Sequence, residues 1–315
     1  LALVLSSAGS ALAVAYAFYG APSVTLVAVL VETLLTLLLV ATLRLIPYRV
    51  LHRQAGMPPL RLPRKVFVSV VAGAFAFVVV WGALSQPPAG RTIAEEHVRL
   101  APEAHAKNAV TAILADFRGL DTLGEITVVA LVLLGVGALL GGGARSSRPV
   151  VTIESEQPAA RVVTRAVAKL LYLPTLLIAA AILVKGFVQT GDGFSAGVVA
   201  ALGILLRYLA FGHEEASRAL PVRYATAISF AGLLVALGVA TVPLFLGGAV
   251  LTHYPPPGTE PVHLGTLELM TAVLFDFGVF LLVFGFAVGV VSFFARAIAR
   301  EEAHAEPSAW GDDGR

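Results

Sequence analysis

Residues 113–140 read ILADFRGLDTLGEITVVALVLLGVGALL, a charged stretch that runs directly into an apolar one. A helix that crosses a membrane needs about 20 mostly apolar residues to span roughly 30 Å of hydrocarbon, and the second part of this stretch has that length. The rest of the chain agrees, because 57% of its 315 residues are hydrophobic and only 13% are charged, against about 25% charged in an ordinary globular domain. The sequence therefore predicts an all-α, polytopic integral membrane protein.

The same length criterion predicts about eight transmembrane helices in two groups of four. They cover approximately residues 1–19, 22–46, 64–84, 122–142, 167–189, 193–212, 222–249 and 267–296. Backbone groups in lipid must be satisfied within the segment, so these runs are helices, and the alternating pattern of a membrane barrel is absent. Because the sequence begins inside an apolar run, we expect it to be a piece of a longer chain.

The connection between the fourth and fifth predicted helices is rich in glycine, serine and proline, as linkers are. It divides the chain into a first membrane region (1–142), a cytoplasmic linker (143–160), a second membrane domain (161–300) and a disordered polar tail (301–315). Arginine and lysine collect in alternate connections, whereas residues 250–266 carry none. The positive-inside rule then places both chain ends on the cytoplasmic side of the cell inner membrane.

Glu32 stands alone near the middle of the second predicted helix. A carboxylate at that depth costs at least about 2.5 kcal/mol on insertion scales unless it faces water or a partner. Such acids commonly mark ion or proton routes, and the alternative is a structural hydrogen bond between helices. Thr36, one turn further on, suits either role.

The charged residues that open the quoted stretch have two explanations. Thr122 and Glu125 have the spacing of a capping box, and acids near a helix N-terminus suit its dipole. This explanation covers Asp121 and Glu125 but leaves Asp116 and Arg118 unexplained. If 108–118 is a short helix that dips toward the membrane, we expect these two to pair there, in an ion route or a subunit contact.

Asp276 is the intramembrane acid of the eighth predicted helix. Glu268, eight residues earlier, would lie within about 80° of the same helical face, so the two could serve one aqueous entry, unless Asp276 is only a structural acid. Lys185 ends the fifth predicted helix, where it either snorkels to the headgroups or joins a charged network. Gly193 and Gly197 have the spacing that lets the two helices of a hairpin pack closely.

Several classes of function have no support in the sequence. The net charge is only +2 and there are no cysteines, so neither a nucleic-acid surface nor a thiolate site is indicated. His253 and His263 do not have the spacing of metal ligands. No nucleophile elbow, Walker loop, HExxH or dinucleotide motif occurs, and we do not expect an enzyme.

Four segments resemble one transporter family. VTAILADFRGLDTLGEITVVAL (110–131) and YGAPSVTLVAVLVETLLTLLLV (19–40) are similar to the C-terminal part of MrpA, the large subunit of Mrp-type multisubunit sodium/proton antiporters. VHLGTLELMTAVLFDFGVFLLVFG (262–285) resembles the last helix of the small subunit MrpB. LVKGFVQTGDGFSAG (183–197) matches the MrpB hairpin less well, because Phe187, Val188 and Asp192 stand where His, Asn and Gly are usual. The chain thus looks like an MrpA C-terminal region fused to an MrpB-like subunit.

The resemblance implies a membrane subunit of a multisubunit Na⁺(cation)/H⁺ antiporter that contributes to the cation path or to coupling between subunits. Other Mrp-type subunits and membrane lipids are the expected partners, Na⁺ and H⁺ are the expected transported ions, and neither a cofactor nor a metal centre is expected. Two alternatives remain: a membrane-arm subunit of a redox-driven, hydrogenase- or complex I-like pump, and a non-conducting scaffold. The candidates for the ion path or coupling are Glu32, Asp116, Arg118, Asp121, Glu125 and Asp276, with Thr36, Lys185 and Glu268 as weaker ones.

Overall fold

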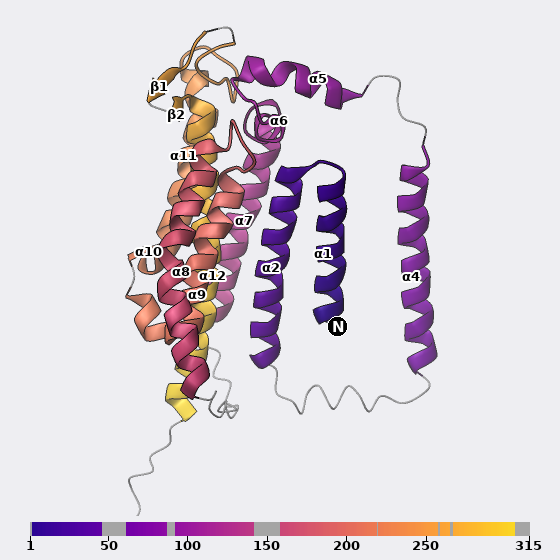
Figure 1. Ribbon diagram of the computed structural model, residues 1–315, viewed down its shortest axis with the longest axis vertical. Helices are drawn as coiled ribbons and strands as arrows, with labels where there is room; N and C mark the ends of the chain where they lie inside the picture. Colours follow the sequence, from indigo (N-terminus) through magenta and orange to yellow (C-terminus); the bar gives the residue numbers. More distant parts are fainter. Residues whose placement is uncertain are drawn as a thin grey trace, which may run out of the picture.

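Long helices that run roughly parallel dominate the protein (Figure 1). The computed structural model describes residues 2–45, 61–86, 92–141, 158–218, 220–257, 259–264 and 267–305. Its long helices are α1 (Ala2–Phe18), α2 (Pro22–Leu45), α4 (Arg61–Leu84), α7 (Gly119–Gly141), α8 (Pro158–Lys185), α9 (Gly193–Ser217), α11 (Ala225–Phe245) and α12 (Thr271–Ala305). Each predicted transmembrane helix corresponds to one of them.

Five helices are long and apolar enough to cross a membrane: α4, α7, α8, α11 and α12. In α1, α2 and α9 the apolar stretch is shorter, over Ser6–Phe18, Pro22–Thr36 and Gly193–Tyr208. The prediction of a helical membrane protein is therefore confirmed, and a count of eight crossings goes beyond what length and composition support.

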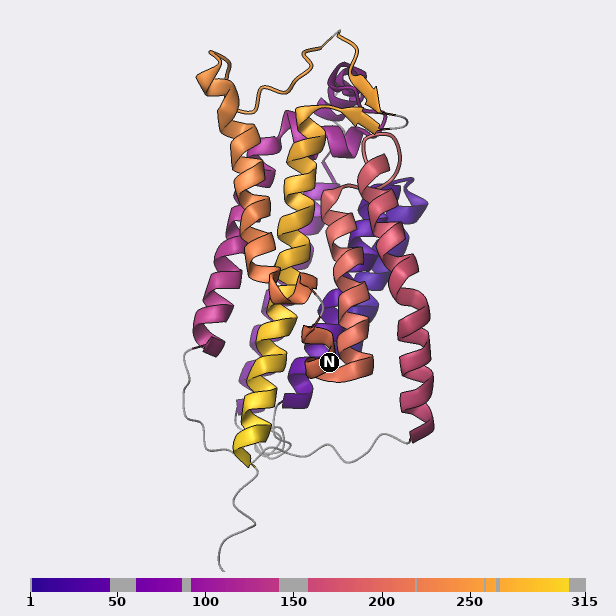
Figure 2. The ribbon, with the colours of Figure 1, turned by 90° about the vertical axis from the view of Figure 1, so that its left-hand side faces the viewer.

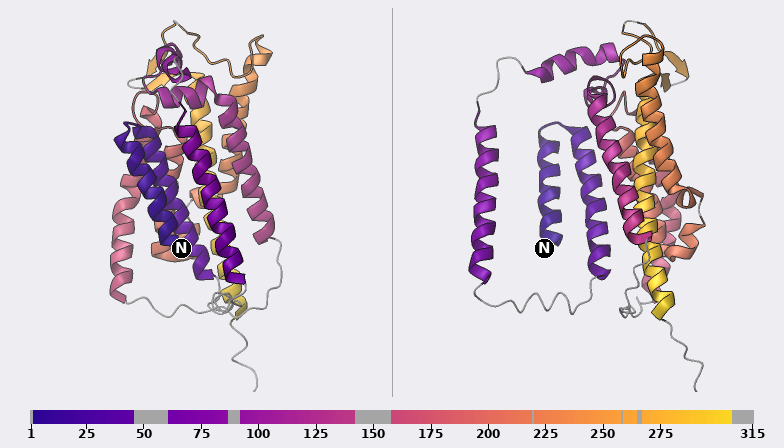
Figure 3. Two further views of the ribbon diagram at one scale, coloured as in Figure 1. Left: turned by 90° about the vertical axis from the view of Figure 1, so that its right-hand side faces the viewer. Right: turned by 180° about the vertical axis from the view of Figure 1, so that it is seen from behind.

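Helix α12 lies at the centre of a bundle with α7, α8, α9 and α11 (Figure 2). The α1–α2 pair flanks this bundle through contacts between α2 and α9. Helix α4 stands apart from both (Figures 1 and 3), and none of its apolar residues Pro63–Ala83 is buried within the chain. The hydrophobic core of the protein therefore surrounds α12.

Small residues bring α11 and α12 close together. A Cβ added to Gly232 would lie 2.5 Å from the carbonyl oxygen of Gly278, and a Cβ on Gly285 would lie 2.4 Å from the backbone nitrogen of Ser229. The Ser229 hydroxyl donates to the carbonyl of Leu282 at 3.1 Å. Close backbone approach at small residues is the usual way helices associate in lipid, and it leaves α12 enclosed.

Short elements cover one end of the bundle. They are α5 (Ile93–Leu100), η1 (Ala101–Ala104), α6 (Ala109–Ala112), the π-helical turn η2 (Ile113–Phe117) and the antiparallel strands β1 (Val262–Leu264) and β2 (Leu267–Leu269). One further short helix, α10 (Leu220–Arg223), follows α9. The helix predicted over 108–118 is confirmed as α6 followed by η2. Helix α5 extends from this end of the bundle across the top of the view, above the α1–α2 pair (Figure 1).

Three predicted boundaries were wrong. The eighth helix begins at Thr271 rather than 267, because residues 262–264 and 267–269 alternate as strands and pair, with Glu268 opposite His263. Helix α12 continues to Ala305, so 301–305 are not a disordered tail: glutamate and alanine favour helix until Pro307 approaches. Helix α8 begins at Pro158, inside the predicted linker. Residues 143–157 and 306–315 lie outside the described residues.

Candidate functional site

The charged stretch that opens α7 does not contain the predicted capping box. Helix α7 begins at Gly119, so Thr122 already lies within its first turn. The Thr122 hydroxyl donates to the carbonyl of Leu114 at 2.6 Å. The reason is local: the π turn η2 leads into α7 with only Arg118 between them, and the hydroxyl satisfies a carbonyl of that turn. The Glu125 carboxylate is therefore not part of a capping box, and it lines the cavity described below.

The predicted pair between Asp116 and Arg118 was also wrong. Arg118 forms its ion pair with Asp121, three residues along the chain, and both side chains are exposed. Exposed pairs of this kind contribute about 0–1 kcal/mol to stability. Asp116 instead lines a separate cavity, so the four charges of this stretch separate into three locations.

The central feature of the membrane part is a cavity of about 250 Å³ between α2, α7, α9 and α12, which we call the acidic cavity. Three carboxylates line it: Glu125 from α7, Asp192 from the residue before α9, and Asp276 from α12. The other lining residues are Val27, Leu114, Thr122, Ile126, Val129, Phe194, Phe275, Val279 and Val283. Both halves of the chain therefore contribute acids to one largely apolar space.

Asp276 and Asp192 meet at the start of α9. Asp276 is 6% exposed, and its Oδ2 accepts a hydrogen bond from the backbone nitrogen of Gly193 at 2.8 Å. Asp192, also 6% exposed, is the N-cap residue of α9, and its Oδ1 accepts from the backbone nitrogen and the hydroxyl of Ser195 at 2.7 and 2.6 Å. The N-terminus of a helix favours negative charge. Within the described part of the chain, neither carboxylate has a cationic side chain as partner.

Gly193 and Gly197 permit this arrangement. A Cβ on Gly193 would lie 2.1 Å from the carbonyl oxygen of Asp276, and one on Gly197 would lie 3.0 Å from that of Phe280. The close helix packing predicted from their spacing is present, but the partner of this glycine face is α12 and not the other helix of the hairpin. Asp276 reaches the backbone of α9 because Gly193 and Gly197 have no side chains to hold the two helices apart.

The turn before α9 is held by the first half of the chain. The amide nitrogen of Asn108 donates to the carbonyls of Gly186 and Gln189 at 3.0 and 2.8 Å. Thr111, which is 1% exposed, places its hydroxyl 2.9 Å from the carbonyl of Gly186 and 3.0 Å from that of Gly191. The segment that precedes η2 is thus the support that positions Asp192.

Glu32 and Thr36 lie apart from these residues. Thr36 donates to the Ser6 hydroxyl at 2.9 Å, and its hydroxyl is 3.4 Å from the Glu32 carboxylate. The Glu32 carboxylate packs against Gly9 of α1. The structure therefore places Glu32 between α1 and α2 and outside the acidic cavity. Lys185 is exposed at the end of α8, and Glu268 lies in β2, so Glu268 does not share a helical face with Asp276.

A second cavity of about 190 Å³ lies at the end of the bundle near strands β1 and β2, and we call it the outer cavity. Its ionisable lining residues are Glu103, His105, Asp116, His253 and Tyr254. Burial raises the pKa of the Asp116 carboxyl above its ordinary value, with the nearby His253 and His105 opposing the shift. Burial likewise lowers the pKa of the His253 imidazole, against the opposing effect of Asp116.

Sequence reasoning did not identify Asn108, Thr111 or His253 as site residues, and it noted Asp192 only as a departure from the MrpB hairpin. Their roles arise from contacts across 75 to 138 positions of the chain, which no local pattern records. The described residues include no group of three or more His, Asp or Glu side chains that could hold a metal ion.

Two family models match different parts of the chain. A family model described as a domain related to the MnhB subunit of Na⁺/H⁺ antiporter matches residues 163–289. A second one, which describes MbhE, the E subunit of MBH, matches residues 60–157. The two matches meet at the start of α8.

Relatives and solved structures extend the similarity to the whole chain. A probable K⁺/H⁺ antiporter A/B subunit of Rhizobium meliloti is 30% identical over 96% of this chain, which spans about a third (33%) of that relative's length. The B subunit of the Na⁺/H⁺ antiporter of Alkalihalophilus pseudofirmus is 36% identical over 34% of this chain and 72% of its own. The structure of the Mrp complex from a Dietzia species superposes with a TM-score of 0.78 at 23% identity, covering 99% of this chain and 33% of that one.

A further solved structure, the membrane-bound sulfane sulfur reductase, an archaeal respiratory membrane complex, superposes with a TM-score of 0.57 at 22% identity. It covers 74% of this chain and 98% of that one. At these identities the two structures establish a shared fold, whereas the Alkalihalophilus relative, of which 72% is covered at 36% identity, establishes the family. The chain therefore belongs to the family of Mrp-type multisubunit Na⁺/H⁺ antiporter subunits, with an MnhB-related domain in its second half.

Proposed function

We propose that this chain works as a membrane subunit of a multisubunit cation/proton antiporter, and that the acidic cavity is its part of the ion path. The observation that carries this proposal is the convergence of Glu125, Asp192 and Asp276 from both halves of the chain on one cavity. Family membership supports the reaction class. Secondary transport rather than enzymatic chemistry accounts for such a site, with Na⁺ and H⁺ as the transported ions and no cofactor.

The chemistry of the cavity follows from its charge. A buried carboxylate without a cationic partner is costly, and among the described residues Asp276 receives one hydrogen bond, from the backbone nitrogen of Gly193. Either a proton or a small cation relieves that cost, so the two compete for the same oxygens. Competition at one site is the basis of exchange when the site opens in turn to each side of the membrane. Glu125, which is exposed along α7, provides the side of the cavity that faces neighbouring subunits.

The arrangement in the membrane is part of the proposal. Eight crossings place α1, α2 and α9 beside the five helices with longer apolar stretches, with residues 1–142 and 161–300 as two membrane regions joined by a cytoplasmic linker. The end of the bundle with β1 and β2 is then extracytoplasmic, and both chain ends are cytoplasmic. The apolar surface on all sides of α4 supports partners there, namely other Mrp-type subunits and lipids.

The test is cation-dependent dissipation of a pre-formed pH gradient in everted vesicles that contain the full set of subunits. Asp276→Asn keeps an oxygen that accepts from Gly193 but cannot exchange a proton. Substitution of a residue that only supports a ligand lowers metal affinity or activity about tenfold or more. We therefore expect Asp276→Asn and Glu125→Gln to lower the rate of exchange at least about tenfold. Glu260→Gln is the matched control, because Glu260 is an exposed acid in the connection between α11 and β1, which we call the outer loop. Wild-type exchange in assembled Asp276→Asn and Glu125→Gln complexes would refute the proposal.

The match of residues 60–157 to MbhE favours one second candidate, a membrane-arm subunit of a redox-driven pump. The same vesicles decide between the two. Exchange driven by an imposed ion gradient, without electron donors or acceptors, supports the antiporter. Ion movement only upon addition of a reductant and an oxidant supports the redox pump, and a scaffold role predicts that no acidic-cavity variant affects transport in assembled complexes.

A further inference from the structure

The outer cavity contains ionisable groups that the acidic cavity does not use. Asp116 faces it from the π turn η2, His105 and Glu103 from the segment around η1, and His253 and Tyr254 from the connection between α11 and α12. The side chain of Asp116 accepts no hydrogen bond and joins no ion pair within the described part of the chain. His105 adopts a left-handed backbone conformation, with φ at 56°, and its buried Nε2 lacks a hydrogen-bond partner among the described residues.

His253 is held in one tautomer by its contacts. Its Nε2 lies 2.8 Å from the carbonyl of Ala115. Because a carbonyl only accepts, Nε2 carries a hydrogen. The other nitrogen, Nδ1, lies 3.1 Å from the Thr271 hydroxyl and is the one atom of the ring that is free to take up a proton. The neutral ring then accepts a hydrogen bond from Thr271 at Nδ1.

Thr271 is built to accommodate both charge states of the ring. Its oxygen accepts from the backbone nitrogen of Tyr254 at 2.8 Å and lies 3.4 Å from the Tyr254 carbonyl. When His253 is neutral, the Thr271 hydroxyl donates to Nδ1. When Nδ1 is protonated, the direction reverses: Nδ1 donates to the Thr271 oxygen, and the hydroxyl turns to the Tyr254 carbonyl. A proton is therefore gained or lost at His253 without leaving a buried polar atom unsatisfied.

We propose that the outer cavity is a proton-exchange site in which the Asp116 carboxylate and Nδ1 of His253 share one exchangeable proton with the extracytoplasmic solution. Uptake forms one O–H bond at Asp116 or one N–H bond at His253 and breaks none in the protein, so the pair changes from a net charge of −1 to zero. Release returns that proton to water. A cavity of about 190 Å³ has room for several waters at about 30 Å³ each, which connect the two groups to the surface.

The electrostatic surroundings support this assignment. Burial raises the pKa of Asp116 and lowers that of His253, so the two values approach one another. A proton moves most readily between groups of similar pKa. The other ionisable groups that line the cavity among the described residues are Glu103, His105 and Tyr254. Met270, just before α12, and Ala272 of α12 also line the cavity and contribute no charge.

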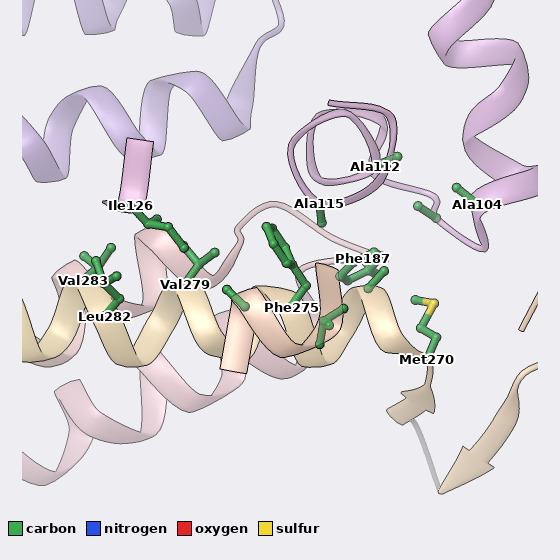
Figure 4. Close-up of a cluster of buried hydrophobic side chains, with 14 of the residues drawn as sticks. Ala104, Ala112, Ala115, Ile126, Phe187, Met270, Phe275, Val279, Leu282 and Val283 are labelled. Atoms are coloured by element: carbon green, nitrogen blue, oxygen red, sulfur yellow. The ribbon is translucent and has the colours of Figure 1, made fainter. Parts of the chain in front are cut away.

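The outer cavity also adjoins the acidic cavity. The His253 ring meets the ring of Phe275 edge to face, with centroids 6.4 Å apart, and Phe275 lines the acidic cavity. Figure 4 shows Phe275 pointing from α12 toward the segment that carries Ala115. Thr271 and Phe275 both belong to the first turns of α12, the helix that carries Asp276. The protonation state of His253 thus acts at the start of the helix that carries the exchanging acid.

This inference rests on the proposed function, and its test separates the two. Right-side-out vesicles with the assembled complex allow the external pH to be varied at constant internal pH while cation/proton exchange is followed. We expect His253→Gln and Asp116→Asn to shift the external pH of half-maximal exchange by about one unit, with the internal pH profile unchanged. Glu260→Gln, in the same outer loop but not lining the cavity, should show the wild-type external profile. Wild-type external profiles in His253→Gln and Asp116→Asn would overturn the inference and leave the acidic cavity untouched.

A second measurement guards against variants that fail to assemble. Thr271→Ser keeps the hydroxyl that serves both states of the ring, whereas Thr271→Val removes it, and we expect only the valine variant to shift the external profile. Infrared difference spectra of the purified complex between acid and alkaline pH should contain a protonated-carboxyl band that Asp116→Asn removes. If that band persists in Asp116→Asn and Thr271→Val retains the wild-type profile, the inference is wrong. Loss of exchange in Asp276→Asn at every external pH remains the separate test of the proposed function.

Discussion

Thr111 is a small buried side chain that connects the two halves of the protein. Its hydroxyl reaches the carbonyls of Gly186 and Gly191, which flank the turn that leads to Asp192. The Asn108 amide also donates to these carbonyls, at 3.0 and 3.3 Å, so the Thr111 hydroxyl contributes about the 0.5–1.5 kcal/mol of a single hydrogen bond. A single hydroxyl, far in sequence from the acids, thus contributes to their placement.

We expect Thr111→Val, which preserves shape but removes the hydroxyl, to lower the stability of the complex by about 0.5–1.5 kcal/mol and to reduce exchange as Asp192 and Asp276 lose their alignment. Thr127→Val is the matched control, because the Thr127 hydroxyl donates only to the carbonyl of Leu123 in its own helix. Thermal denaturation of the purified complex measures the difference. Equal melting temperatures for both variants would contradict this role of Thr111.

Asp116 gives a pH dependence whose sign is determined by its burial. Its folded-state pKa is raised above the ordinary value of 3.8, so the folded protein binds this proton more tightly than the unfolded chain does. The stabilising contribution is complete below the unfolded value and is lost as the pH rises through the raised folded pKa. Asp116 therefore weakens the fold at neutral pH relative to acid.

The Asp116→Asn variant removes that dependence. We expect its melting temperature to exceed that of the wild type at neutral pH, with the advantage shrinking as the pH falls toward the unfolded value of 3.8. Asp121→Asn, which alters an exposed ion pair, should show no comparable pH-dependent gain. A constant difference between Asp116→Asn and wild type at all pH values would show that the Asp116 proton is not linked to folding.

At the scale of elements, the packing of α11 on α12 determines where Asp276 lies. Gly232 of α11 contacts the backbone of α12 so closely that any Cβ meets the Gly278 carbonyl and the nitrogen of Leu282. Gly238, on the same helix, has no atom within 4 Å of the position of its Cβ. Two glycines of one helix therefore have opposite consequences when they are replaced.

Gly232→Ala should destabilise the complex by about 1–3 kcal/mol through overpacking, and its shift of α12 should impair exchange. Gly238→Ala should be neutral or stabilising by up to about 1 kcal/mol, because alanine favours helix over glycine. Thermal denaturation and exchange in vesicles measure both effects. Similar behaviour of the two variants would mean that the α11–α12 contact does not determine the position of α12.

For the whole molecule, the chain without cysteines allows its orientation to be measured directly. A cysteine introduced at Glu260, in the outer loop, or at Arg218, the C-cap residue of α9, would be the only one among the 315 residues. Both side chains at these positions are exposed. Opposite sides of the membrane are predicted for the two positions by the distribution of arginine and lysine.

In right-side-out vesicles we expect a membrane-impermeant maleimide to label Glu260→Cys and to leave Arg218→Cys unlabelled until the membrane is permeabilised. The reverse pattern in everted vesicles is the control for sidedness. Labelling of both positions from one side would exclude the proposed orientation and change the side of the membrane to which the outer cavity opens.

The sequence determined the class of the protein and its helices, because the length and polarity of each apolar run are local properties that lipid requires. It also determined the family, through the segments around Asp116 and Asp276. Its errors were local as well. Thr122 was interpreted as a cap because a motif does not reveal that a preceding π turn continues into α7. Arg118 was paired with Asp116 although Asp121, its actual partner, is also within reach.

Only the tertiary structure decided which charges share a space. Asp192 and Asp276 meet because Gly193 lets α9 approach α12, and Asp116 meets His253 through contacts that join residues 138 positions apart. Glu32 was an equally good ion-path candidate in the sequence, but it faces α1 and does not line the acidic cavity. The tendency of a helix to enter lipid depends on its own composition, whereas the assembly of a site depends on side-chain volumes at helix crossings, and those act only once the helices are packed.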